Sequence, residues 1–485
     1  MGQKTICIHG HFYQPPREDP LSDKIPDEAG AAPYNNWNER IFSECYLPNA
    51  DQRNFRNISF NIGPTLFKWL EAYDPKTYAS IISQENDNYT KYGIGNALSQ
   101  PFHHVILPLS SSADKVTQIY WGIADFEHRF GHKPVGMWLP ETAVDLKTLT
   151  VLADLNIKFT ILAPWQINQR NLDNQQQQPL LIKLPGGREP MIVFVYHQDV
   201  STSVSFDSHA TRNADNFIDQ RLVPHFNNRQ SGNSELLLIA SDGELYGHHK
   251  PHRDKFLAHL LNGALEQRNL ALTYPGLWLK DNHPSHEVKL NEYSSWSCHH
   301  GIKRWIEECD CTPGASWKKP LRQAFDTIAR LLDMTYKNYL SNYTTTPFKL
   351  RNEYIKVMLG QTDLSSLLQQ FIDHTPSNSE LSAIGMLLAA QYERQRMFTS
   401  CGWFFDHFHR IEPQNNIAYA AQAVWFTKLA TGVDFYQDGV RLLKKVMDQE
   451  TGLRGDTVFS ERYQRSLDFY EDRNDYFNPS SNLFT

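Results

Sequence analysis

Two acidic residues stand just after apolar runs at distant points of the chain, where they could act as a catalytic pair. Glu141 directly follows Pro140, which should end the preceding strand because proline cannot donate to a strand ladder. Asp242 closely follows the apolar run 236–240, and Glu244 stands two residues further on. Burying unpaired carboxylates is costly, so acids in these positions indicate a site. Two carboxylates across a cleft are the machinery of glycoside hydrolysis, in which one attacks the anomeric carbon and the other protonates the leaving oxygen.

Each acidic segment also has a purely structural interpretation. Glu141 could be a surface residue that caps the next helix. Asp242 and Gly243 could begin a turn, with Glu244 capping a helix. If the strand instead continues, Asp242 and Glu244 lie on one face of it. The sequence leaves these alternatives open.

A pair of histidines, His9 and His11, follows the first apolar run, residues 5–8. The pair could hydrogen-bond sugar hydroxyls or bind a metal ion. Histidines at strand ends also occur as satisfied structural residues. A His-x-His pair alone is weakly specific for zinc, which usually needs further protein ligands.

Aromatic residues make up 12% of the chain, and some are concentrated near other polar candidates. Trp296 and Trp305 lie in one short segment with His299. Tryptophan rings can stack on the apolar faces of sugars, and core packing is the alternative; for Trp305 we weigh the two equally. Trp403 lies in the aromatic cluster 401–406, which could form a subsite wall or a hydrophobic seam between domains.

Three cysteines could contribute to a structural metal site. Cys298, Cys309 and Cys311 lie close together in the sequence, with His299 or His300 nearby. The Cys-x-Cys spacing departs from the usual zinc pattern of two to four intervening residues. We therefore favour reduced packing cysteines and predict no metal, and whether the three cysteines bind one stays open from the sequence.

The first 290 residues alternate short apolar runs with helical stretches, which favours a βα barrel or an open doubly wound sheet. Polar residues at the ends of several strands favour the barrel, because its chemistry lies at the carboxyl ends of the strands. No glycine-rich phosphate-binding motif follows a strand. The expected strands are 5–8, 57–60, 135–138, 159–162, 191–195 and 236–240, and the expected helices between them include 64–73 and 112–130.

From residue 291 the pattern becomes helical. The expected helices are 320–340, 353–359, 364–374, 380–398, 417–431 and 437–448. We therefore expect a catalytic domain over 1–290, a helical domain that contributes to the cleft over 291–450, and a polar, loop-rich tail over 451–485.

The composition limits the class of protein. The chain has 485 residues, of which 40% are hydrophobic and 21% charged, and its net charge is −7. This balance is typical of a globular protein and gives no source for nucleic-acid or membrane binding. No apolar run approaches the length of a membrane span, and the first residues lack a secretory pattern. Six cysteines in so long a chain do not make a disulfide scaffold, so we expect a cytoplasmic protein of undetermined oligomeric state.

Four segments, in order, resemble the motifs of glycoside hydrolase family 57. His9-Gly10-His11 with Gln14-Pro15 resembles its first motif, and Trp138-Leu139-Pro140-Glu141 resembles the segment of its nucleophile. The run from Asp242 to His248 resembles the segment of its acid/base, and Ser294-Ser295-Trp296 with Gly301 and Trp305 resembles its last motif. The motifs extend over about 300 residues.

The resemblance implies an α/β fold, a distorted (β/α)7 barrel followed by a mainly α-helical domain. It implies retaining chemistry on an oligo- or polysaccharide of the α-glucan type, by hydrolysis, transfer or branching, with no cofactor. Glu141 would be the nucleophile and Asp242 the acid/base. The residues expected to contact the sugar are His9, His11, Gln14, Trp138, Glu244, Trp296, His299, Trp305 and Trp403.

Two other classes of function remain open from the sequence. A metal-dependent, amidohydrolase-like enzyme on a similar barrel would use His9, His11 and Asp242, together with His104 and His197. A barrel that binds glycans without turnover is the third possibility. Metal analysis and product analysis distinguish the three.

Overall fold

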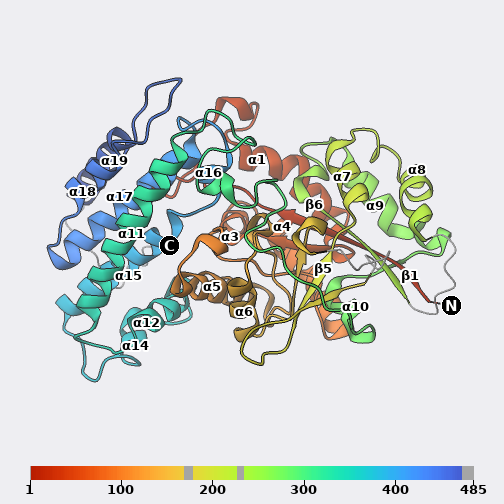
Figure 1. Ribbon diagram of the computed structural model, residues 1–485, viewed down its shortest axis with the longest axis horizontal. Helices are drawn as coiled ribbons and strands as arrows, with labels where there is room; N and C mark the ends of the chain where they lie inside the picture. The colour runs from red at the N-terminus through yellow and green to blue at the C-terminus, as the bar shows by residue number, and fades with distance from the viewer. Residues whose placement is uncertain (1, 169–177, 227–233, 472–485) are drawn as a thin grey trace. The chain divides into compact units, whose positions relative to one another are not determined.

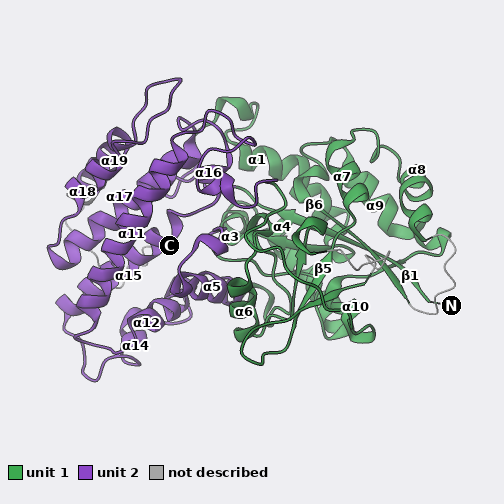
Figure 2. Cartoon of the chain, viewed as in Figure 1, with its two compact units in different colours: residues 1–14, 26–102, 126–297 green, residues 15–25, 103–125, 298–485 purple. Residues whose placement is uncertain are grey.

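The computed structural model describes residues 2–168, 178–226 and 234–471, which form two compact units (Figures 1 and 2). The barrel unit comprises residues 1–14, 26–102 and 126–297. The helical unit comprises residues 15–25, 103–125 and 298–485. The main change from one unit to the other thus falls at residue 297, but two earlier segments also belong to the helical unit.

Strand β1 (Lys4–Phe12) is central to the barrel unit, and its two longest pairings, both parallel, are with neighbouring barrel strands (Figure 1). These are β2 (Ser59–Ile62) and β6 (Glu235–Asp242). In this register His11 lies opposite Asp242 on one side and Asn61 on the other. Because parallel strands end at the same edge of a sheet, β1 gathers polar residues from three strands at one place.

Short bridges and one hydrogen bond close these strands into a distorted barrel. Strand β3 (Phe159–Leu162) pairs in parallel with β5 (Met191–Val195). The isolated bridges that connect β2 to β3 are Phe60 with Ala97, Ser99 with Met137, and Gly136 with Phe159. The backbone N–H of His197, just beyond β5, donates to the Leu238 carbonyl of β6 over 2.7 Å. The order around the barrel is therefore β1, β2, residues 97–99, residues 136–137, β3, β5 and β6.

The barrel interior is apolar along most of its length and polar at the carboxyl ends of the strands. One interior cluster contains Cys7 of β1 together with Leu236, Leu238 and Ala240 of β6. Side chains alternate between faces along a strand, so His9 and His11 continue the Cys7 face and Asp242 continues the Leu238 face. The intervening residues Ile6, Ile8, Leu237 and Ile239 belong to a second cluster outside the barrel. The strand period alone therefore directs both histidines and Asp242 to the inside.

Helices cover the outside of the barrel (Figure 1). The main ones are α3 (Pro64–Tyr73), α4 (Pro75–Tyr92), α6 (Leu146–Asp154), α7 (Gln198–Phe206), α9 (Arg253–His259) and α10 (Pro275–Asp281). Two short strands are additional to the barrel order: β4 (Leu180–Ile182) pairs antiparallel with β5, and β7 (Ala271–Leu272) pairs with β1.

The structure confirms several elements predicted from the sequence and corrects others. Strands 159–162 and 191–195 and helices 64–73 and 112–130 have the predicted bounds, the last being α5 (Ser112–Phe130). The strand predicted at 135–138 is wrong, because only single bridges form there. A Cβ atom on Gly136 would lie 2.3 Å from the Phe159 ring, so this glycine allows an unusually close approach of the neighbouring segment.

Long helices pack side by side in the helical unit (Figure 1). They are α11 (Lys318–Leu340), α15 (Asn378–Arg396), α17 (Ile411–Thr431), α18 (Tyr436–Leu443) and α19 (Gly455–Glu471), with the shorter α12 (Pro347–Glu353), α13 (Ile355–Met358), α14 (Leu364–Leu368) and α16 (Cys401–Phe404) beside them. Helix α17 is buried on nearly all sides, which is typical of a helix at the centre of a bundle.

The tail predicted to be loop-rich from residue 451 instead contains α19. Its residues Phe459 and Tyr463, four apart, lie on one face of the helix and are buried. Their rings contact Tyr436 of α18, and Tyr463 also meets Trp425 of α17. This aromatic face explains why a polar segment is helical. Residues 472–485 of the same prediction lie outside the described residues.

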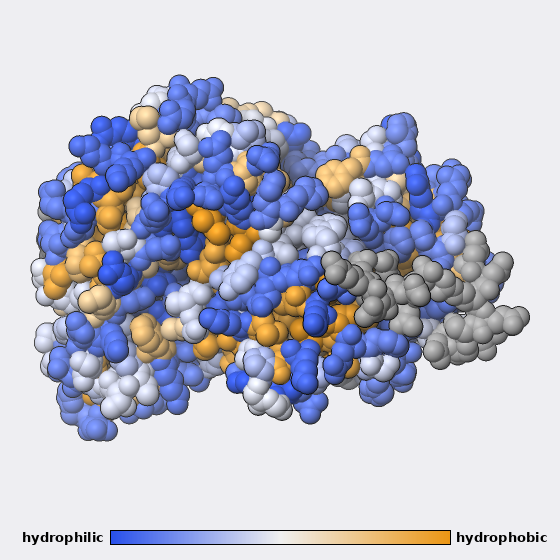
Figure 3. Space-filling view, in the orientation of Figure 1, coloured by the Kyte–Doolittle hydropathy of each residue, from blue (hydrophilic) through white to orange (hydrophobic). Residues whose placement is uncertain are grey.

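Hydrophilic residues cover most of the face shown in Figure 3, where hydrophobic residues form separate patches. Every helix in the described part of the chain is too short or too polar to cross a lipid bilayer.

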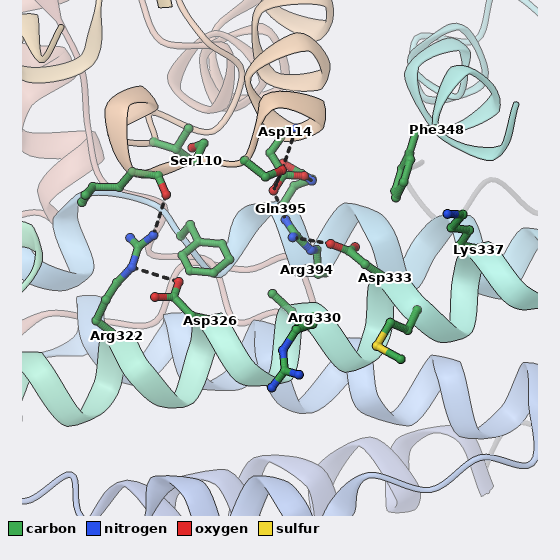
Figure 4. Close-up of a pocket in the computed structure, with 16 residues that line it drawn as sticks. Ser110, Asp114, Arg322, Asp326, Arg330, Asp333, Lys337, Phe348, Arg394 and Gln395 are labelled. Carbon is green, nitrogen blue, oxygen red and sulfur yellow. Dashed lines mark hydrogen bonds and ion pairs between the residues drawn. The ribbon is translucent and has the colours of Figure 1, made fainter. Parts of the chain in front are cut away.

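A pocket of about 460 Å³ in the helical unit is lined by paired charges (Figure 4). The Arg394 guanidinium lies 2.9 Å from Asp114 and 2.6 Å from Asp333. The fully buried Arg351 lies 3.1 Å from Asp114 and hydrogen-bonds Gln391. Although burial opposes ionisation, Arg394 and Arg351 lower the pKa of Asp114 overall. These ion pairs bring opposite charges of α5, α11 and α15 together, so the network serves to hold the three helices in place.

We expect Arg351→Met to lower the free energy of unfolding by about 3 kcal/mol, because it leaves Asp114 buried with only one cationic partner. Urea denaturation followed by circular dichroism measures the change. The difference in unfolding free energy between the variant and the unsubstituted protein should shrink below about pH 4. There, protonation of Asp114 removes the stabilisation that its lowered pKa confers. Arg330→Met is the matched control, since Arg330 is exposed and lines the same pocket. Equal effects of the two substitutions would contradict the role of the network.

Candidate active site

His9 and His11 lie within β1, rather than after it as predicted, and both are buried at the carboxyl end of the barrel. His9 Nδ1 lies 2.9 Å from Ser59 Oγ, and its Nε2 lies 3.1 Å from Asn61 Oδ1. The Asn61 amide also reaches His11 Nδ1. Burial lowers the pKa of His9 to about 3 and that of His11 to about 4. Both rings are therefore neutral near pH 7.

Tryptophan rings enclose the two histidines. Trp138 is fully buried and stacks on His9 with ring centroids 4.7 Å apart and on His11 at 5.2 Å. Trp296 meets Trp138 edge to face at 5.0 Å and lies beside His11 at 6.2 Å. Trp296 is only partly buried, so it contributes aromatic surface at the open end of this group.

Glu141 lies in a short 3₁₀ turn (Pro140–Thr142) and accepts two side-chain hydrogen bonds. Its Oε2 accepts from Trp296 Nε1 at 3.1 Å and from Ser297 Oγ at 2.6 Å. Its backbone has φ 57° and ψ 19°, a left-handed conformation that is uncommon outside glycine and is concentrated at functional sites. The alternative of a helix cap is wrong, because Asp145 caps the next helix, α6, by accepting from Thr148 N–H.

Asp242 is the last residue of β6, and its side chain is exposed to solvent at the strand end. The protein atoms crowded around the carboxyl group, and secondly the negative charge of Glu141, raise its pKa to about 7. The two carboxyl groups thus lie close enough for their charges to interact. This brings together the two acidic residues that the sequence singled out.

Glu244 does not share a strand face with Asp242, because β6 ends at Asp242 and a 3₁₀ turn (Gly243–Leu245) follows. The Glu244 carboxyl group is buried and accepts from the Tyr13 backbone N–H at 3.0 Å and the Tyr46 hydroxyl at 2.8 Å. Burial and the Asp242 charge raise its pKa to about 8. Glu244 therefore joins the ends of two strands through hydrogen bonds.

Gln14 belongs to the same hydrogen-bonded cluster as Glu244 and Tyr46, because its side chain hydrogen-bonds Tyr46. The structure thus explains the positions of Gln14 and Glu244 without a ligand. Their contact with sugar stays a prediction.

Sequence reasoning missed four residues that hold the candidate site together: Ser59, Asn61, Tyr46 and Ser297. Asn61 offered a signal, since it interrupts an apolar strand and is buried there. It also donates to Gln100 Oε1 at 2.7 Å, which fixes its amide. Ser297 gave no such signal, because its partner is distant in the sequence.

Three predicted sugar-contacting residues belong to the helical unit: His299, Trp305 and Trp403. His299 is exposed, whereas Trp305 and Trp403 are buried. Trp403 stacks on Phe398 within that unit. A role for these three in substrate binding stays a prediction.

The histidines proposed for a metal-dependent hydrolase do not form a ligand set. His104 belongs to the helical unit and hydrogen-bonds Ser400 there at 2.7 Å. His197 accepts from Val200 N–H at the start of α7, and its ring contacts His225. Within residues 2–168, 178–226 and 234–471, the groups of side chains placed to share a metal ion lie elsewhere and contain neither His9 nor Asp242.

Comparison with solved structures shows the same fold in several enzymes. An exo-type maltose-forming amylase from Pyrococcus sp. ST04 is 14% identical, with a TM-score of 0.74 over 94% of this chain and 88% of that one. A GH57 branching enzyme from Thermococcus kodakaraensis is 16% identical, with a TM-score of 0.59 over 96% and 95%. A 4-alpha-glucanotransferase from Thermococcus litoralis is 14% identical, with a TM-score of 0.55 over 88% of this chain and 60% of that one.

Comparison with protein families gives two matches. Residues 315–465 match a domain of unknown function (DUF3536). A search among curated proteins finds no match. Residues 17–290 match Glycosyl hydrolase family 57 and make up more than half of the chain, in agreement with the distorted (β/α)7 barrel and its helical partner unit. The chain therefore belongs to family 57 and is a glycoside hydrolase or glucanotransferase.

Proposed function

We propose that the chain cleaves α-glucosidic bonds of an α-glucan with retention of configuration, passing the sugar to water or to another sugar. Glu141 is the nucleophile and Asp242 is the acid/base. The observation that carries this proposal is that the carboxyl groups of Asp242 and Glu141 lie close enough together for their charges to interact at the carboxyl end of the barrel, which also raises the pKa of Asp242. The substrate class is supported by relatives of the same fold described as a maltose-forming amylase and a 4-alpha-glucanotransferase.

The hydrogen bonds to Glu141 suit a nucleophile. Trp296 Nε1 and Ser297 Oγ both donate to Oε2, and such bonds are strongest when the acceptor is ionised. They fix one oxygen of the carboxylate in place and so orient the group toward the anomeric carbon. The unusual backbone conformation of Glu141 positions its carboxyl group in the 3₁₀ turn that follows residues 136–137 of the barrel.

Asp242 is protonated in part of the molecules near neutral pH, as a general acid must be. In the first step a carboxylate oxygen of Glu141 bonds to the anomeric carbon, the glycosidic bond breaks, and the Asp242 proton passes to the leaving oxygen. The new ester is neutral, so the charge that raised the pKa of Asp242 is gone. Asp242 then favours its ionised form and takes a proton from water or a sugar hydroxyl as that oxygen displaces Glu141.

The neutral histidines and the tryptophans shape the sugar site. His11 lies opposite Asp242 in the sheet register, and Asn61 orients the ring. A neutral imidazole can exchange hydrogen bonds with sugar hydroxyls without placing a positive charge beside Asp242, which would lower its pKa. Trp296 offers a ring to the apolar face of a sugar.

Asp242→Asn should lower kcat/KM on an α-1,4-linked oligosaccharide by about 10²- to 10⁴-fold, because the leaving oxygen is no longer protonated. Chromatographic product analysis measures this loss. Asp281→Asn, an exposed residue of α10, should leave the rate unchanged. Near-normal turnover by a pure, folded Asp242→Asn protein would refute the assignment, and binding without turnover in the unsubstituted protein would favour the non-catalytic alternative.

The pH dependence of kcat/KM should show whether Asp242 is the general acid. On an oligosaccharide, kcat/KM should fall as the pH rises through about 7, because deprotonation removes the proton that Asp242 donates. On an α-glucosyl fluoride this fall should be weak or absent, since fluoride leaves without protonation. Steady-state rates over a pH series test both. The same alkaline fall with the two substrates would contradict the role of Asp242.

Glu141→Gln should abolish the covalent glucosyl-enzyme. A fluorinated glucosyl fluoride that slows breakdown of the intermediate should add one sugar to the unsubstituted protein, and peptide mass spectrometry should place it on Glu141. Asp242→Asn is the matched control and should still form the adduct, because this substrate needs no acid. An adduct on another residue would reassign the nucleophile.

A further inference from the structure

Four side chains outside the barrel site bring metal-ligating atoms together. The ligand atoms of Cys298, His300, Cys309 and Cys311 all lie within 4.8 Å of one another. Cys298 Sγ lies 4.0 Å from Cys309 Sγ, and Cys311 Sγ lies 3.5 Å from His300 Nδ1. In a tetrahedral zinc site, bond lengths of about 2.3 Å to sulfur and 2.0–2.1 Å to nitrogen separate ligand atoms by about 3.5–3.8 Å. The observed separations are close to these values.

Two tight turns of the helical unit present the ligands in pairs. Gly301 N–H donates to the Cys298 carbonyl at 3.1 Å, and this turn carries His300. Thr312 N–H donates to the Cys309 carbonyl at 2.8 Å, and this turn carries Cys311. Each turn supplies two ligands separated by one residue. The short Cys-x-Cys spacing would be unfavourable if a single turn had to supply all the ligands. Here the ligands come from two turns, so this spacing does not prevent a metal site.

The burial pattern fits ligands better than packing residues. Cys298 and Cys309 are buried, but Cys311 is half-buried and His300 is exposed. Free cysteines that only fill a core are among the most buried residues. A disulfide is also a poor explanation, because a sulfur–sulfur bond of about 2.05 Å is much shorter than the 4.0 Å between Cys298 and Cys309.

Surrounding groups are suited to thiolates. Backbone N–H groups of His300 and Arg304 hydrogen-bond the Cys298 sulfur, and that of Cys311 hydrogen-bonds the Cys309 sulfur. Outer hydrogen bonds of this kind orient metal ligands. Lys318 is fully buried, its Nζ has no hydrogen-bond partner among the described residues, and it interacts electrostatically with Cys298 and Cys309. A zinc ion with three thiolates and a neutral histidine carries a net charge of −1, which a buried ammonium group would balance.

We propose that Cys298, His300, Cys309 and Cys311 bind one structural Zn²⁺ ion. The protein fills all four positions, so the site is closed and does not activate water. Binding releases the three thiol protons to solvent and ties the segment 298–311 into one unit. Ser297, which hydrogen-bonds Glu141, directly precedes Cys298 in the chain. The ion would therefore also stabilise the segment next to Ser297. The zinc site does not depend on the proposed function.

The zinc content of the purified full chain tests this proposal directly. The protein is made in zinc-supplemented medium, freed of any histidine tag and analysed by inductively coupled plasma mass spectrometry. We expect one zinc per chain, and less than about one tenth of this for Cys309→Ser. Cys401→Ser is the matched control, a buried cysteine of the same unit, and should retain the zinc. Equal zinc loss in both variants, or an unsubstituted protein with little zinc, would overturn the proposal.

Cobalt replacement tests the unsubstituted chain, in case Cys309→Ser fails to fold. After removal of metal by a chelator, addition of Co²⁺ should produce thiolate-to-cobalt charge-transfer absorption and the strong visible bands of tetrahedral cobalt. The signal should saturate at one equivalent and disappear when zinc is added. Weak octahedral absorption, or a Cys298–Cys309 disulfide found by mass spectrometry of the native protein, would overturn the site.

Discussion

The proposed mechanism depends on the interaction between two carboxyl groups, those of Asp242 and Glu141. Crowding around Asp242 and, secondly, repulsion by the Glu141 charge raise the pKa of Asp242 to about 7, so that this carboxyl group is protonated in part of the molecules at neutral pH. Trp296 and Ser297 donate hydrogen bonds to Glu141 and stabilise its charge, as the proposed nucleophile requires. In this proposal, two carboxyl groups of similar ordinary pKa acquire different roles from their surroundings.

The barrel provides the positions on which this interaction depends. Parallel pairing places His11 between Asn61 and Asp242, and the alternation of side chains turns His9, His11 and Asp242 inward. The same arrangement has a cost in stability. A carboxyl group whose pKa is higher in the folded than in the unfolded protein destabilises the fold as the pH rises from about 4 to 7. The apolar barrel interior beneath the site offsets that cost.

Much of the fold was predictable because the signals are local. Continuous apolar runs gave β3 and β5, and helical periodicity gave α3 and α5. Residues 135–138 were mispredicted because pairing there is limited to single bridges around Gly136, and α19 was missed because its aromatic face is hidden in a polar segment. In the site, Glu141, Asp242, His9 and His11 could be found as polar residues near the ends of apolar runs. Asn61 and Ser297 depend on strand register and on a distant loop, which the sequence does not reveal.

The most direct test is the pKa of Asp242 with and without its charged neighbour. Carbon-13 NMR of protein labelled at the aspartate carboxyl carbons can follow this titration, with Asp242→Asn to assign the signal. We expect a pKa near 7 in the unsubstituted protein and a clearly lower value in Glu141→Gln, because the substitution removes the negative charge and leaves the crowding. An unchanged pKa would contradict the coupling of the two carboxyl groups, and a value near 4 in both proteins would remove the basis for Asp242 as the acid.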